Sequence, residues 1–124
     1  MIMNDASIEF LCEVNRFMKL IRNQLNKQRV LLMDRQISKI NSLCDRMDKV
    51  IKNYCDEMQI EILDYSGIEY EIGLPVDPLN LDDFEEKDIK LYINMMIEPV
   101  IKEKGTSVII HNGKVILSDK KESF

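Results

Sequence analysis

The chain has 124 residues, of which 45% are hydrophobic and 31% are charged, which suits one modest domain or a helix joined to a small domain. No apolar run approaches the ~18 residues that span a bilayer, and no secretory signal is visible, so we expect a cytoplasmic protein that does not associate with membranes. Residues 1–58 carry ten Lys or Arg and eight Asp or Glu, whereas residues 59–124 carry seven and fourteen. The acidic second half disfavours nucleic acid as a partner, because phosphate binding needs clustered positive charge.

A helix is the first predicted element, and Asp5 or Ser7 can cap its start. Apolar residues then follow at alternating steps of three and four, and they are Leu11, Val14, Met18, Ile21 and Leu25. A longer stripe with the same stepping has nine members, namely Val30, Met33, Ile37, Ile40, Cys44, Met47, Ile51, Tyr54 and Met58. This rhythm is typical of a helix that buries a narrow seam against another helix. We therefore predict that the nine residues form a dimer interface.

The two stripes are out of phase, and the break lies between residues 25 and 30. Either one long helix over residues 6–58 shifts its buried seam there, or the chain forms a helical hairpin that turns near Asn26. Hairpin turns usually use Gly, Pro, Asp or Ser, and no Gly or Pro precedes Gly67. We therefore favour one long helix, and the hairpin is the alternative.

After Met58 the apolar spacing changes to period two, which is typical of strands. Two alternating runs, 60–62 and 68–72, flank a turn at residues 64–67 and together predict a hairpin. The sequence Gly-Leu-Pro at residues 73–75 breaks the second run.

The last third of the chain predicts further strands. Residues 89–97 alternate cleanly, with Met95 on the buried face and Met96 on the other face, where it is a candidate for an exposed contact. A β-branched run at 106–110 predicts another strand. The pair Asn112–Gly113 favours a tight hairpin after it, because both residue types tolerate positive φ.

The predicted architecture is therefore α+β. A long N-terminal coiled-coil helix occupies residues 1–58, a small antiparallel β domain occupies 59–118, and a flexible tail occupies 119–124.

Few residues indicate chemistry. His111 is the sole histidine, is expected to be exposed, and has no partners at metal-ligand or catalytic spacing. An acidic cluster with one lysine has the composition of a metal-dependent nuclease site, but its polar surroundings favour a solvated loop; its members are Asp82, Asp83, Glu85, Glu86 and Lys87. We expect no catalytic residue, no metal and no cofactor, and hence no enzyme.

Three short segments carry a resemblance to a known family. They are Gly-Leu-Pro-Val-Asp-Pro at 73–78, Lys-Gly at 104–105 and Asn-Gly-Lys-Val-Ile at 112–116. In these segments, and in the layout of a dimerising helix before a small β domain, the chain resembles the GrpE family of nucleotide exchange factors for DnaK-type chaperones. The motifs fall within residues 64–117.

The resemblance implies a homodimer whose β domain docks on the nucleotide-binding domain of a DnaK-type chaperone. Docking favours the open state of that domain, which binds ADP less tightly, so that ADP leaves faster. The residues expected to contact the chaperone are Leu74, Pro75, Val76, Gly105, Asn112 and Gly113. The alternative is a coiled-coil homodimeric scaffold or adaptor with a β protein-binding module and no link to a chaperone.

Overall fold

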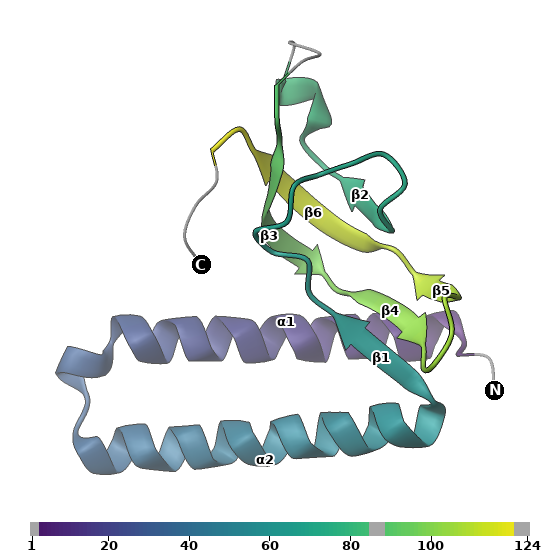
Figure 1. The fold of residues 1–124 in the computed structure, drawn as a ribbon. Helices are drawn as coiled ribbons and strands as arrows, with labels where there is room; N and C mark the ends of the chain where they lie inside the picture. Colours follow the sequence, from purple (N-terminus) through teal and green to yellow (C-terminus); the bar gives the residue numbers. More distant parts are fainter. Residues whose placement is uncertain (1–2, 85–88, 121–124) are drawn as a thin grey trace. The chain divides into compact units, whose positions relative to one another are not determined.

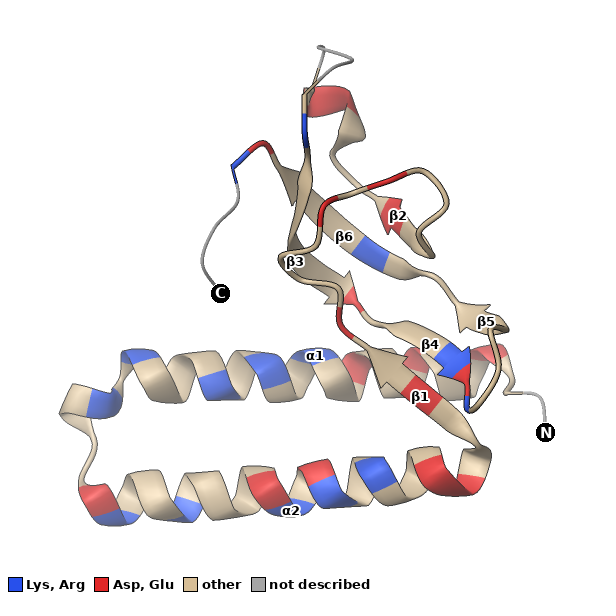
Figure 2. Ribbon diagram, viewed as in Figure 1, with Lys and Arg blue, Asp and Glu red and all other residues tan. Residues whose placement is uncertain are grey.

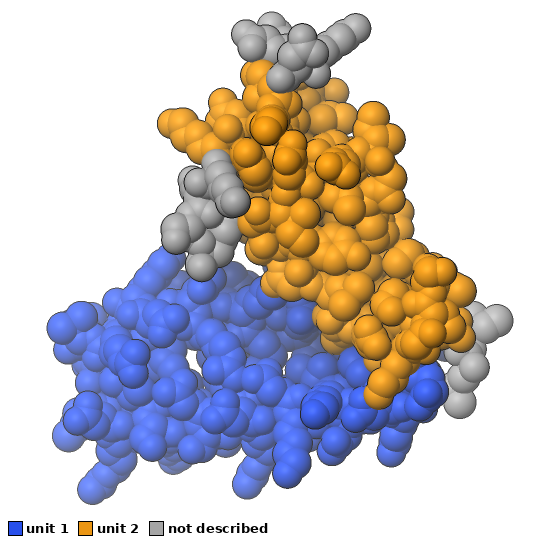
Figure 3. All heavy atoms as spheres, viewed as in Figure 1, with its two compact units in different colours: residues 1–59 blue, residues 60–124 orange. Residues whose placement is uncertain are grey.

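The computed structural model of the chain describes residues 3–84 and 89–120. It has a mixed α+β fold with two compact units, residues 1–59 and residues 60–124 (Figure 3). The first unit is helical, and the second is built from short strands. Among the described residues, no helix combines the length and the apolar character that crossing a membrane requires.

The helical unit is a hairpin of two long helices rather than one rod (Figure 1). Helix α1 spans Asp5–Lys27, the 3-10 helix η1 spans Arg29–Leu31, and helix α2 spans Asp34–Met58. The prediction of a single helix over residues 6–58 is therefore wrong, and the alternative of a hairpin is observed. The structure does not confirm a coiled coil.

The hairpin turns without glycine or proline because none of its residues needs a positive φ. The backbone N–H of Gln28 donates to the carbonyl oxygen of Gln24 (2.9 Å) and closes α1. A 3-10 turn follows, and Leu32 and Met33 then adopt extended backbone conformations. The N–H of Met33 donates to Oε1 of Gln36 (3.0 Å), which fixes the start of α2. Ordinary residues can adopt all of these conformations, so the usual turn residues are not required.

Both outer ends of the hairpin are capped. Oδ1 of Asn4 accepts a hydrogen bond from the N–H of Ser7 (2.8 Å), so Asn4 is the cap, and the predicted Asp5 lies in the first turn instead. At the other end, Gln59 adopts a left-handed conformation with φ 57°, and its Nε2 donates to the carbonyl oxygen of Asp56 (2.7 Å).

The second unit contains two three-stranded sheets. The first has the order β1-β4-β5, is antiparallel throughout, and is formed by Ile60–Leu63, Val100–Glu103 and Ile109–His111. The second has the order β2-β6-β3 and is formed by Val76–Pro78, Gly113–Ser118 and Tyr92–Glu98. Strand β2 runs parallel to β6, whereas β3 runs antiparallel to it. The unit is therefore not purely antiparallel.

The predicted hairpin of residues 60–72 does not form, because its two runs pair with other strands. Strand β1 pairs with β4, which lies far along the chain. Residues 67–70 instead follow the outer edge of β3, where the N–H of Gly67 donates to the carbonyl oxygen of Ile93 (2.7 Å). Hydrogen bonds to β3 thus satisfy the backbone N–H and C=O groups of this segment.

The pair Asn112–Gly113 is not a hairpin turn, contrary to the prediction. It links β5 to β6, which belong to different sheets, and the φ of Gly113 is not positive. A Cβ at this position would lie 2.7 Å from Cε of Met96 and 3.0 Å from the carbonyl oxygen of Glu98. Glycine at position 113 therefore permits β6 to approach β3 closely. Gly105, with φ 75°, lies in the turn between β4 and β5.

A β-bulge in β3 reverses the predicted faces of two adjacent methionines. Ile93 pairs with Leu117 and Met95 pairs with Ile116, so β3 has one extra residue between these pairs. Met96 consequently has only 6% of its surface exposed, whereas Met95 is 52% exposed. One core cluster of this unit is formed by Val76, Ile93, Met96, Val100, Val115 and Leu117, and Ile60 and Ile101 are also buried.

Candidate functional site

An apolar groove runs between the two helices of the hairpin. It comprises two hollows of about 440 Å³ and 290 Å³, which share Phe17, Ile21 and Ile40 in their walls. Only two of the lining side chains, those of Gln24 and Gln28, are polar. A groove of this character suits an apolar side chain or helix surface of a binding partner.

Helix α1 contributes to this groove because it carries two adjacent apolar stripes. The side chains of Leu11, Met18 and Leu25 are buried. Phe10 and Phe17 each lie one residue earlier in the heptad and are 68% and 61% exposed. The apolar face of α1 is therefore wider than one neighbouring helix can cover.

Helix α2 has the same excess of apolar surface. Leu43, Met47 and Val50 are all exposed on it at spacings of four and three residues. Single exposed apolar residues are normal, but a contiguous set on two neighbouring helices marks an interaction surface.

The structure divides the predicted nine-residue dimer seam between different environments. Val30 and Met33 precede α2 and are exposed, so the seam is not continuous at its start. Ile37 and Cys44 are buried. Of the remaining members, Met47 is exposed, and the half-buried ones are Ile40, Ile51, Tyr54 and Met58.

One ion-pair cluster connects the two helices. Nη2 of Arg22 in α1 approaches Oδ1 of Asp45 (3.4 Å) and contacts the carboxylate of Asp48, both in α2. The hydrogen bond to Asp48 raises the pKa of Arg22 above its usual value. At the end of α2, burial raises the pKa of the Cys55 thiol, and the charge of Asp56 adds to that shift, which makes a nucleophilic role for this cysteine unfavourable.

In the β unit, the structure brings three of the six predicted chaperone-contact residues together at the surface, namely Leu74, Pro75 and Asn112. The N–H of Gly113 donates to the carbonyl oxygen of Pro75 (2.9 Å), so Leu74 and Pro75 lie beside Asn112. Asn112 is exposed, and Leu74 and Pro75 are half-buried.

Three of the predicted contact residues do not join this surface. Val76 and Gly113 are buried and contribute to packing. Gly105 is exposed in the turn at the opposite end of β5 from Asn112.

Ile72 is a surface residue that the sequence pattern assigned to a strand. It is 97% exposed in a turn that the N–H of Leu74 closes onto the carbonyl oxygen of Glu71 (3.2 Å). Gly73, with φ 110°, follows it directly. That glycine is the one signal in the sequence that indicates a turn at this position. Ile72 is thus a single exposed apolar side chain, two residues before the half-buried Leu74, and not part of an extended patch like the groove.

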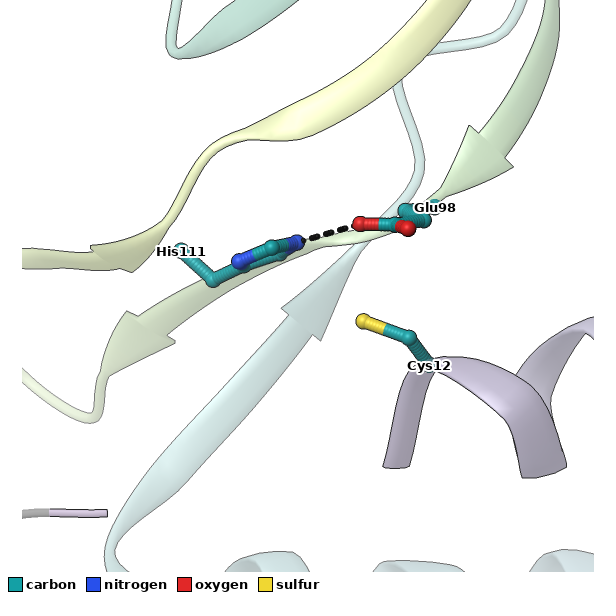
Figure 4. A group of neighbouring side chains, drawn as sticks. All are labelled: Cys12, Glu98 and His111. Carbon is teal, nitrogen blue, oxygen red and sulfur yellow. Dashed lines mark hydrogen bonds and ion pairs between the residues drawn. The ribbon is translucent and has the colours of Figure 1, made fainter. Parts of the chain in front are cut away.

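The sole histidine forms a hydrogen bond that joins the two sheets of the β unit. Nε2 of His111 in β5 lies 2.8 Å from Oε1 of Glu98 in β3 (Figure 4). Oε2 of Glu98 also lies 3.5 Å from Nζ of Lys114 in β6. His111 is therefore only partly exposed, contrary to the prediction that it is exposed, and it links β5 to β3.

The acidic cluster is only partly covered by the structure. Asp82 and Asp83 lie in the 3-10 helix η2 (Leu81–Asp83) and are exposed. Residues 85–87 of the cluster, and residues 121–124 of the predicted tail, lie outside the described residues.

No family model, curated protein or solved structure matches the chain. Among the described residues, apolar side chains are presented to solvent by the groove on the hairpin and by the turn that holds Ile72, which leads into Leu74 and Pro75. The groove is a contiguous set of apolar side chains on two helices, which is the character of a protein-contact surface, whereas the turn contributes the single side chain of Ile72.

Proposed function

We propose that the chain is a homodimeric, GrpE-like cochaperone that promotes ADP release from a DnaK-type chaperone. The observation that supports this function most is the pairing of β2 with β6. Residues 73–78 and 112–116 lie far apart in the sequence, and they are the segments on which the family resemblance mainly rests. In the fold they form adjacent strands of one sheet, as a common contact surface requires.

The helical unit supplies the dimer in this proposal. The groove leaves Phe17, Leu43 and Met47 in water, and a second copy of the chain would bury them. Dimerisation gives each assembly two β units, so that two chaperones, or two sites, can be engaged together.

The β unit performs the exchange in this proposal, and no covalent chemistry is involved. Ile72, Leu74 and Asn112 contact the open form of the nucleotide-binding domain more favourably than the closed form. A difference of ~3 kcal/mol between the two forms changes the affinity for ADP more than a hundredfold. No residue of this chain needs to touch the nucleotide.

Release of labelled ADP from a DnaK-type chaperone tests the exchange function. We expect the wild-type chain to accelerate release and Ile72→Asp to abolish most of the acceleration. Leu79→Asp is the matched control, because Leu79 is an exposed apolar residue of the same unit that lies outside the turn around Ile72. No acceleration at saturating wild-type protein would contradict the proposal.

The second candidate is a homodimeric adaptor whose β unit binds a protein other than a chaperone. The near-complete exposure of Ile72 supports it equally, because an exposed isoleucine suits an apolar pocket on any partner. A dimer that leaves ADP release unchanged would favour the adaptor over the exchange factor.

A further inference from the structure

We infer that a second copy of the chain covers the groove with its hairpin reversed, so that the turn end of one hairpin packs on the open end of the other. The turn end is the end that holds η1, and the open end holds Asn4 and Gln59. This inference rests on the proposed homodimer and adds its orientation.

The exposed apolar surface has the size that such a contact needs. Six large side chains of the two helices are between 42% and 68% exposed; they are Phe10, Phe17, Leu20, Leu43, Met47 and Val50. A standard interface takes ~800 Å² from each partner, and large apolar side chains that are about half exposed on two neighbouring helices can supply much of it.

The two halves of the hairpin differ in net charge, and the contrast lies mainly along α1, which is acidic near its start and basic toward the turn (Figure 2). The turn half, residues 16–46, contains eight Lys or Arg and two Asp, a net charge of +6. The open half, residues 3–15 and 47–58, contains two Lys and six Asp or Glu, a net charge of −4. Reversed packing places unlike charges together, whereas packing with both turns at one end places like charges together.

The charges on α1 lie where a partner would meet them. Four charged residues of α1 lie on one flank of the exposed Phe10 and Phe17, because they follow one another at the helical spacings of four, three and eleven residues. They are Glu9, Glu13, Arg16 and Lys27. All four are exposed. In a reversed pair centred near Phe17, the acidic start of this flank in one copy faces the basic end of the same flank in the other.

The orientation determines where the two β units are attached. Residue 60 follows α2 directly, and α2 has 25 residues. In the reversed dimer the two attachment points are therefore separated by roughly 37 Å, at 1.5 Å per residue. Packing with both turns at one end would instead bring the attachment points together.

Charge reversal distinguishes the two orientations by the sign of its effect. We expect Glu9→Lys with Glu13→Lys to raise the dimer dissociation constant at least about tenfold, because Lys then faces the basic turn half. Adding Arg16→Glu and Lys27→Glu to the same chain should restore the affinity. The control is Glu103→Lys with Asp119→Lys, two exposed residues of the β unit that give the same change in net charge.

Sedimentation equilibrium of the full-length chains measures these constants, and circular dichroism verifies that the helices are retained. Tighter dimerisation of Glu9→Lys with Glu13→Lys would overturn the orientation but leave the dimer standing. A wild-type monomer would overturn the dimer, independently of the result for ADP release. If the variant fails to fold, the wild-type salt dependence decides: weaker dimerisation at high salt supports the reversed packing, and unchanged or tighter dimerisation contradicts it.

Discussion

The backbone N–H of Gly113 donates a hydrogen bond to the carbonyl oxygen of Pro75, with 2.9 Å between the two atoms. This bond lies at the start of the parallel pairing of β2 with β6. It joins two segments that the sequence separates by almost forty positions, and it ties the surface around Ile72 to the core of the β unit.

The first prediction concerns the close approach at Gly113. Gly113→Ala should lower the free energy of unfolding by about 1–3 kcal/mol, because the new Cβ would collide with Met96 and with the backbone of Glu98. Asn112→Ala should change it by less than about 0.5 kcal/mol, since Asn112 does not have a positive φ. Urea unfolding measures both values. If Asn112→Ala lowered the free energy of unfolding more than Gly113→Ala, residues 112–113 would act as a hairpin turn, contrary to the structure.

The second prediction compares the two neighbouring methionines of β3. Met96→Ala should destabilise the protein by about 2–4 kcal/mol, because it opens a cavity in the core. Met95→Ala removes an exposed side chain and should cost less than about 1 kcal/mol. Equal losses of unfolding free energy in the two variants would contradict the placement of Met96 in the core and of Met95 at the surface.

The positions of these methionines show what the sequence could not specify. Strict alternation over residues 89–97 predicted a strand and its approximate extent, and β3 confirms that. A bulge depends on pairing with β6, which is a tertiary contact, so the pattern of one strand cannot reveal it. Similarly, the pair Asn112–Gly113 has the composition of a hairpin turn, but packing against Met96 is the reason for its glycine.

The helical unit illustrates the same limit. Its apolar stripes and the phase break near residue 26 were visible in the sequence, and both helices follow from them. Whether such a break bends or reverses the chain depends on a 3-10 turn with no distinctive composition. Phe10 and Phe17 were detectable as a second stripe one residue ahead of Leu11 and Met18, and this signal alone could have predicted the groove.

The third prediction concerns Cys55. Since burial raises the pKa of its thiol in the folded chain, the unfolded thiol ionises at lower pH than the folded one. The stabilisation from the neutral buried thiol is fully present below the unfolded pKa and is lost as pH rises through the folded pKa. The urea midpoint should therefore fall as pH rises beyond the ordinary thiol pKa of ~8.5, and it should fall less in Cys55→Ala. Identical declines in the two proteins would contradict this assignment.

The fourth prediction concerns the end of α2. Gln59 adopts the left-handed conformation with φ 57°, which glycine adopts without a steric penalty. Gln59→Gly should therefore raise the free energy of unfolding by about 0.5 kcal/mol, after allowing for the lost hydrogen bond to Asp56. Gln59→Val should lower it, since a β-branched residue tolerates this conformation least. Thermal unfolding of the two variants measures the difference. A Gln59→Val protein more stable than Gln59→Gly would contradict the left-handed C-cap at residue 59.

The central claim is that the groove between α1 and α2 is a dimer interface. The most direct test is the sedimentation mass of the full chain and of Phe17→Glu, which places a carboxylate in the middle of the groove. We expect the wild-type chain to sediment as a dimer, twice its mass of 14.6 kDa, and the variant to sediment as a folded monomer with unchanged helix content. A wild-type mass of 14.6 kDa at every concentration, or a dimer that Phe17→Glu leaves intact, would contradict it.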